Sequence, residues 1–267
     1  MATNAVNPPQ AAEKTFGKTY LYPDGTYDII ASNRPVFAPR VEKPKASPPS
    51  EKPQDDQEEK KPKAKKSDLQ RAQSRARANV RRLALANDFR WFVTLTIDPK
   101  KIDSYDPQAC TKRLGQWLSN HVRRNGLRYV LVPERHKSGR IHYHGFFSDS
   151  VEAVDSGHKD AQGHPVYNLP EWDYGFTTAI ELYGEYHAAV GYVCKYIGKE
   201  SEKIGGRWYF SGGQLQKPVE KFVEISWADL QIMQSEEFQE QYGQGWLKAT
   251  PGGLFAGING IRLEDNT

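Results

Sequence analysis

Two histidines stand close together in the stretch IHYHGFF (141–147), which otherwise has the apolar composition of a buried strand. Because side chains along a strand point alternately to its two faces, His142 and His144 share one face. A loop at 137–139 ends in the glycine that three-residue hairpin loops favour, and pairing across this loop sets Glu134 beside His142. One carboxylate and two imidazoles on one face favour a divalent-metal site with positions left open for a substrate.

A second group of reactive side chains repeats at helical spacing in EYHAAVGYVCKYIGKES (185–201). At 100° per residue, the predicted helix has an apolar side and, opposite to it, a side of two phenols and two ammonium groups: Tyr192, Lys195, Tyr196 and Lys199. A lysine or a metal-bound phosphate beside a tyrosine can assist loss of the phenol proton. The residues are therefore candidates for nucleophilic catalysis, and the alternative is a solvated helix surface.

Two neighbouring elements are expected to position these groups. The stretch WFVTLTID (91–98) alternates between apolar and polar positions, which predicts a strand inside a sheet. The stretch at 106–126 predicts a helix, with Asp106 as a suitable N-cap, proline at the first helical position and Gly126 at its end.

Residues 68–86 predict a helix with a strongly basic surface. The stretch 60–90 contains only two acidic residues, Asp68 and Asp88. Five arginines are expected to be exposed on this helix: Arg71, Arg75, Arg77, Arg81 and Arg82. Such an excess of positive charge favours binding of a polyanion, and nucleic acid is the obvious one. The alternative is a solvated charged face.

The composition limits the classes of protein that remain. The chain has 267 residues, a net charge of +4 and 37% hydrophobic residues. Its two cysteines, Cys110 and Cys194, form neither a disulfide framework nor a thiolate zinc site. No apolar run approaches the ~20 residues that a membrane span needs, and the N-terminus lacks a signal-peptide core. We therefore expect a cytoplasmic protein with no membrane partner.

Three of these stretches resemble, in this order, the motifs of HUH endonucleases. They are the strand FVTLT, the HYH stretch with a glutamate eight residues before its first histidine, and the helix with YVCKY. The similarity is closest to the initiators of rolling-circle replication in plasmids and small single-stranded DNA phages. Residues 80–200 carry the resemblance, which extends to about residue 235.

The resemblance implies an α+β fold, with a central antiparallel β-sheet and flanking helices. It implies that Glu134, His142 and His144 hold Mg²⁺ or Mn²⁺ at the scissile phosphate of single-stranded origin DNA. A tyrosine would attack this phosphate, leaving a 5′-phosphotyrosine link and a free 3′ hydroxyl that primes synthesis. Tyr192 fits the primary nucleophile and Tyr196 a second or auxiliary one.

The resemblance also implies a host helicase and polymerase as partners in a bacterial cytoplasm, and it does not indicate the oligomeric state. Three other functions remain open. The same chemistry serves transposases and relaxases. Two histidines and a carboxylate also serve iron-dependent oxygenases. A non-catalytic DNA-binding protein with structural histidines would never form a covalent adduct with DNA.

We expect three segments along the chain. Residues 1–66 are predicted to be a largely disordered extension, because proline and charged residues dominate 41–66. A short hairpin is possible at 19–32, around a Pro-Asp-Gly turn. The endonuclease domain, with the basic helix at its N-terminus, is expected at 67–243, followed by a tail at 244–267.

Overall fold

The computed structural model describes the following residues: 15–32, 64–182, 184, 186–232, 235–237, 245–250 and 253–261. The chain divides into two compact units, one formed by residues 61–217 and the other by 1–60 together with 218–267. The predicted linker at 41–66 lies outside the described residues, except for its last three positions, which begin α1 (Ala64–Leu85).

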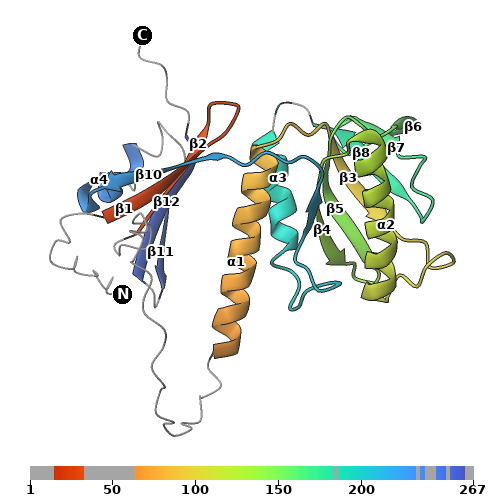
Figure 1. Cartoon of the computed structure of the whole chain (residues 1–267), viewed down its shortest axis with the longest axis horizontal. Coiled ribbons are helices and arrows are strands. Elements are labelled where there is room, and N and C mark those ends of the chain that lie inside the picture. The colour runs from red at the N-terminus through yellow and green to blue at the C-terminus, as the bar shows by residue number, and fades with distance from the viewer. Residues whose placement is uncertain are drawn as a thin grey trace, which may run out of the picture. The chain divides into compact units, whose positions relative to one another are not determined.

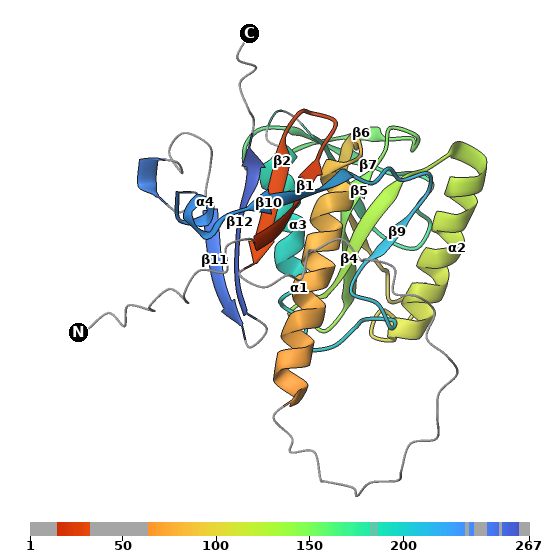
Figure 2. The same cartoon turned by 60° about the vertical axis from the view of Figure 1, so that its left-hand side comes forward.

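The larger unit is built on a seven-stranded antiparallel sheet with the strand order β6-β7-β8-β3-β5-β4-β9. Its strands are β3 (Trp91–Thr96), β4 (Tyr129–Arg135), β5 (Ile141–Phe147), β6 (Val154–Lys159), β7 (Pro165–Asn168), β8 (Thr177–Glu181) and β9 (Phe210–Gly212). Helix α2 (Pro107–Asn125) covers one face, and α1 and α3 (Tyr186–Tyr196) cover the other (Figure 1 and Figure 2). The predicted α+β fold with a central antiparallel sheet and flanking helices is confirmed.

Helix α2 and its face of the sheet enclose the main apolar core. Leu114 of this helix, Leu95 of β3 and Tyr143 of β5 are fully buried there. The helix begins and ends as its sequence predicts. Asp106 accepts a hydrogen bond from the Gln108 backbone N–H (2.8 Å), and Gly126 closes the helix with φ = 70°, a conformation that favours glycine.

The opposite face is covered by α1 and α3, which pack against each other. Small and apolar side chains make this contact possible: Val80 and Ala84 of α1 and Val190 and Val193 of α3 are fully buried. The Tyr186 hydroxyl, at the start of α3, donates a hydrogen bond to the Ala84 carbonyl (2.6 Å). The position of α3 over the sheet is therefore determined by α1.

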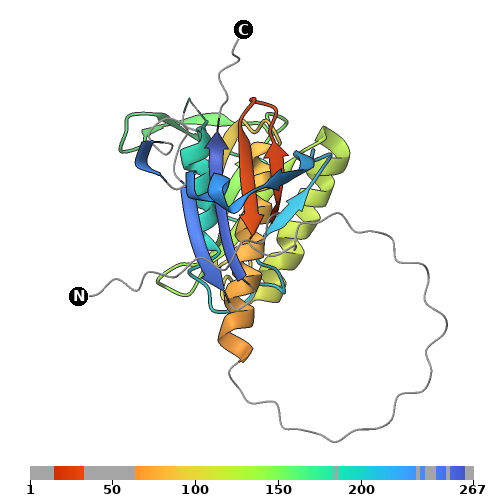
Figure 3. The ribbon, with the colours of Figure 1, turned by 90° about the vertical axis from the view of Figure 1, so that its left-hand side faces the viewer.

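The smaller unit contains a five-stranded antiparallel sheet with the order β10-β1-β2-β12-β11 (Figure 3). Its elements are β1 (Thr15–Leu21), β2 (Tyr27–Ser32), β10 (Val219–Ile225), α4 (Trp227–Ile232), β11 (Gly245–Thr250) and β12 (Gly253–Ile261). Strands β1 and β2 form a hairpin, and Gly25 in its turn has φ = 80°.

The division of the chain differs from the segments expected at 67–243 and 244–267. The structure separates the units between residues 217 and 218, and it forms β11 and β12 within the segment expected to be a tail. Strand β12 pairs with β2, where Ile258 stands opposite Ile29. This pairing joins residues far apart in the sequence, so no local pattern could indicate it.

Candidate active site

Glu134 and His144 meet on the face of the sheet that α1 and α3 cover. Strands β4 and β5 pair in the predicted register, with Glu134 opposite His142. Glu134 Oε2 lies 2.9 Å from His144 Nε2, and only 15% and 11% of the two side chains are exposed. The contact lacks hydrogen-bond geometry, and His144 Nε2 has no hydrogen-bond partner among the described residues. A buried ring nitrogen therefore faces a carboxylate oxygen with no hydrogen bond between them.

Strand β3 holds the other ring nitrogen of His144. Thr94 stands opposite His144 in the β3–β5 pair, and its Oγ1 lies 3.1 Å from His144 Nδ1. A partner at Nδ1 orients the ring and directs Nε2 toward Glu134. The sequence analysis assigned Thr94 no role. The alternation of FVTLT placed its side chain on this face, but the pairing of β3 with β5 was needed to bring it to His144.

His142 lies on the same face of β5, but its ring is turned toward His136. The two rings stack with centroids 5.1 Å apart and an interplanar angle of 12°. The ring centroids of His142 and His144 are 6.3 Å apart. Among the residues that the structure describes, no three His, Cys, Asp or Glu side chains lie close enough to hold a metal ion together. The structure thus brings Glu134 and His144 together and leaves His142 beside them.

Burial favours the neutral form of both imidazoles. It lowers the pKa of His144 to about 4, and the nearby Glu134 carboxylate only partly opposes this effect. The pKa of His142 is also lowered, first by burial and then by the neighbouring His136. Neutral imidazole is the form that binds metals. With a carboxylate beside the unpartnered His144 Nε2, this donor set fits a divalent cation.

Tyr196 forms a wall of this site. Its ring lies parallel to the His144 ring, with centroids 4.2 Å apart and an interplanar angle of 7°. Only 6% of Tyr196 is exposed, and burial together with the hydrogen bond to Tyr192 raises the pKa of its phenol. The sequence predicted Tyr196 on an exposed helix face, whereas the sheet covers it in the structure.

Tyr192, one turn earlier on α3, is the accessible tyrosine of the pair. It is 46% exposed, and its ring packs edge-on against Phe92 of β3 with centroids 5.8 Å apart. Its hydroxyl oxygen accepts a hydrogen bond of 2.5 Å from the Tyr196 hydroxyl. The two phenols are therefore linked, but only Tyr192 is open to a large substrate.

Lys199 lies beyond the end of the tyrosine helix. The helix expected over 185–201 ends at Tyr196, and a turn follows in which the Lys199 N–H donates to the Tyr196 carbonyl (3.1 Å). Lys199 Nζ lies 2.6 Å from Glu134 Oε1 and 4.4 Å from the centre of the Tyr196 ring. The ammonium group thus neutralises the carboxylate whose other oxygen faces His144. Lys195 remains on α3 and is exposed.

The five predicted DNA-binding arginines lie on α1, away from the Glu134–His144 pair. They are exposed or partly buried: Arg71, Arg75, Arg77, Arg81 and Arg82. Arg71 forms an exposed ion pair with Asp68 (2.6 Å). Arg77 borders the turn that carries Lys199, because a Cβ added to Gly198 would clash with Arg77 Nη2. Glycine at position 198 therefore leaves room for this guanidinium group.

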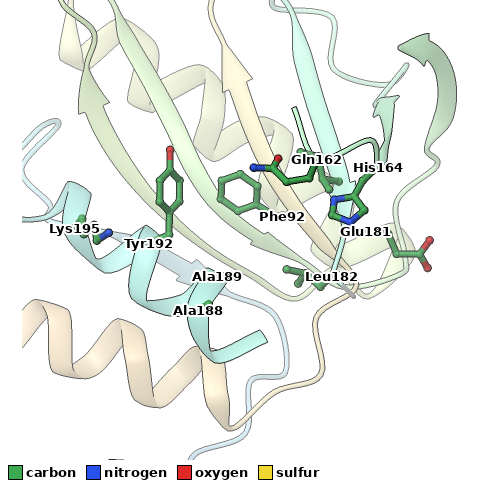
Figure 4. Close-up of a pocket in the computed structure, with 10 residues that line it drawn as sticks. Phe92, Gln162, His164, Glu181, Leu182, Ala188, Ala189, Tyr192 and Lys195 are labelled. Atoms are coloured by element: carbon green, nitrogen blue, oxygen red, sulfur yellow. The ribbon is translucent and has the colours of Figure 1, made fainter. Parts of the chain in front are cut away.

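A pocket of about 480 Å³ opens beside Tyr192 (Figure 4). It lies between β3, the end of β8, the β6–β7 turn and α3. The residues that line it include Phe92, Gln162, His164, Ile180, Tyr192 and Lys195. Sequence reasoning identified only the two α3 residues, since the other segments meet only in the folded sheet.

Comparison with protein families gives one match. Residues 90–201 match the family described as replication-associated protein ORF2. The matched segment is less than half of the chain, but it runs from β3 to the turn after α3 and includes every residue of the Glu134–His144 site and of the tyrosine pair. The match supports a function as a replication initiator.

Two other comparisons give no match, since neither the curated proteins nor the solved structures contain a significant relative. Within the described part of the chain, no helix has the length and apolar character required to cross a membrane.

Proposed function

We propose that this protein initiates replication by nicking single-stranded DNA at an origin through metal-assisted tyrosine transesterification, the chemistry of the HUH endonucleases that its sequence resembles. One observation carries the proposal. The accessible phenol of Tyr192 is linked through Tyr196 to the buried Glu134–His144 pair. A nucleophile and a group able to bind a cation therefore adjoin on one face of the sheet.

In the proposed reaction, the Tyr192 oxygen forms a bond to the scissile phosphorus and the P–O3′ bond breaks. The phenol loses its proton and the departing O3′ gains one, so the products are a 5′-phosphotyrosine and a 3′ hydroxyl. Tyr196 positions the nucleophile by its hydrogen bond to the Tyr192 oxygen. Lys195, three residues after Tyr192 and on the same side of α3, places a positive charge near the phosphate. Because a phosphodiester is exchanged for a phosphodiester, the reverse attack can rejoin the ends.

The metal would be held by Glu134, His142 and His144. A bound Mg²⁺ or Mn²⁺ would polarise the scissile phosphate and stabilise the charge that develops on it. Lys199 shares the Glu134 carboxylate and keeps its charge compensated. We assign Tyr196 the auxiliary role, because its ring is buried against His144 while that of Tyr192 is exposed.

The arginines of α1 are proposed to contact the phosphate backbone of the origin. Contacts of this kind release counterions, so binding should weaken as the salt concentration rises. A host helicase and a host polymerase are the proposed partners, because a free 3′ hydroxyl must be extended and the duplex must be opened.

The test is a cleavage assay on labelled single-stranded DNA that contains the replicon's own origin, with Mn²⁺ or with a chelator. We expect a covalent protein–DNA adduct on a denaturing gel with Mn²⁺ only. Tyr192→Phe should abolish the adduct, whereas Tyr196→Phe should reduce its rate and keep it detectable.

If folded, metal-loaded wild-type protein forms no adduct on a verified origin, the nucleophile assignment is wrong. A non-catalytic DNA-binding protein with structural histidines would then be the better description. An adduct that survives in Tyr192→Phe and disappears in Tyr196→Phe would reverse the two tyrosine roles.

A further inference from the structure

The pocket beside Tyr192 has the size and lining of a small-ligand site. Its volume of about 480 Å³ lies within the range of about 300–1,000 Å³ that such sites occupy. Its wall is apolar at Phe92 and Ile180, and it carries polar groups at Gln162 and His164. The reaction proposed above uses none of these four side chains.

Phe92 provides an aromatic surface within this pocket. It is half-buried on β3, two residues before Thr94 and therefore on the same face of the sheet. Its ring is fixed by edge-on contacts with Tyr192 (5.8 Å between centroids) and Phe146 (6.3 Å). Figure 4 shows the Phe92 ring between Tyr192 and Gln162. Rigid aromatic rings of this kind are the usual platforms on which unstacked nucleic-acid bases are bound.

The β6–β7 turn presents Gln162 and His164 to the pocket and is ordered by Asp160. Asp160 Oδ1 accepts hydrogen bonds from the backbone N–H groups of Gln162 (2.9 Å) and His164 (2.8 Å). Its other oxygen lies 3.2 Å from His164 Nδ1. The Gln162 amide points toward Phe92 (Figure 4). Because it carries both donors and an acceptor, this amide can pair with the edge of a base.

The charges around the pocket agree with a nucleotide. Lys195 lies at the α3 side and can face a backbone phosphate. The Glu181 carboxylate at the opposite side is paired with Arg90 (3.0 Å), which reduces its repulsion of an anion. The pocket thus has a cation on the side of the nucleophile and an amide on the side away from it.

We propose that this pocket binds one unstacked base of the single-stranded substrate, at the nucleotide next to the phosphate that Tyr192 attacks. The base lies on Phe92, and the Gln162 amide reads its edge. Adenine is the base expected to bind best, because an amide pairs with it in bidentate fashion. The inference rests on the proposed function for the position of the strand, and it adds base selection at one position.

The experiment places the fluorescent base 2-aminopurine at successive positions of an origin oligonucleotide and adds the full chain in the presence of a chelator. The chelator prevents cleavage, so base binding is measured apart from chemistry. We expect the fluorescence to change strongly at one position next to the nick site. Phe92→Leu keeps an apolar side chain but removes the aromatic ring, and it should weaken binding about tenfold, in line with the ~1–3 kcal/mol that one base stack contributes.

Gln162→Ala should keep most of the binding but lose the preference among the four bases at that position. The matched control is Gln116→Ala on α2, which changes the same residue type on the other side of the sheet and should alter neither property. Binding without a responsive position, an equal response in Phe92→Leu, or no binding of the oligonucleotide would overturn the inference.

The two proposals can fail separately. A responsive, Phe92-dependent position without any covalent adduct in Mn²⁺ would retain the base pocket and remove the nickase. An adduct in Mn²⁺ with no responsive position would retain the nickase and remove the base pocket.

Discussion

Strand β5 presents two faces that differ in chemistry although their residues alternate along seven positions. Toward α2, Ile141, Tyr143 and Phe147 are completely buried in the apolar core. Toward α3, His142 and His144 lie among polar and ionic groups. The first face therefore stabilises the sheet, while the second contains a buried nitrogen with no hydrogen-bond partner among the described residues. Such a group costs stability, which is typical of functional sites.

The elements that cover the two faces explain the difference. Helix α2 contributes large apolar side chains, and Trp117 stacks on Phe147 with centroids 5.7 Å apart. Helix α3 instead places Tyr196 on His144, and the turn after it brings Lys199 to Glu134. One strand can therefore serve both packing and chemistry, provided that the helices on its two sides differ.

The largest expected difference between the faces concerns stability. Phe147→Ala should lower the free energy of unfolding by about 3–5 kcal/mol, because it removes a fully buried ring. His142→Ala, the control on the other face, should cost less than about 1 kcal/mol, since His142 is only partly buried. Chemical denaturation of the full chain in a chelator measures both values. Equal losses would mean that the α3 face also carries the stability of the sheet.

The next effect is a pH dependence that arises on the α3 face. The pKa of His144 is about 4 in the folded chain and about 6.5 when unfolded, so the unfolded state binds the proton more readily between these values. The stability that is fully present above about pH 6.5 should therefore fall by about 3 kcal/mol as the pH approaches 4. Denaturation at several pH values in a chelator should show this slope, and His144→Asn should reduce it. An unchanged slope in the variant would assign the effect to other groups.

The smallest expected effect isolates the orientation of His144. Thr94→Val removes the hydroxyl next to His144 Nδ1 and keeps the size and branching of the side chain. Loss of such an orienting partner typically weakens metal binding about 10–100-fold. Titration of Mn²⁺ by calorimetry measures the change, and Thr178→Val, an exposed position on β8, is the control. Unchanged Mn²⁺ affinity in Thr94→Val would show that the ring needs no partner at Nδ1.

Local patterns in the sequence predicted the elements of the larger unit well. The alternation in 91–98 gave a strand, and the cap residues of 106–126 gave the two ends of α2. The loop with Gly139 also predicted the register that places Glu134 opposite His142. Each of these signals involves residues close in sequence, whose backbone conformations and hydrogen bonds are set by their own types.

The composition of the site could be predicted only in part. The alternation of β5 placed His142 and His144 on one face, but it could not show that His142 would stack on His136. Helical spacing placed Tyr192 and Tyr196 on one side of α3, but the sheet buries the second and leaves the first accessible. In both cases, a distant element changed the surroundings of a correctly placed residue.

The sequence by itself determined which side chains could do chemistry and on which strand face or helix side each one stands. Only the tertiary structure decided which of them meet: Glu134 with His144 and Lys199, and Tyr192 with Phe92 and the β6–β7 turn. The reason is physical. Periodicity fixes the direction of a side chain relative to its own backbone, whereas contact between elements depends on strand order and on packing across the sheet.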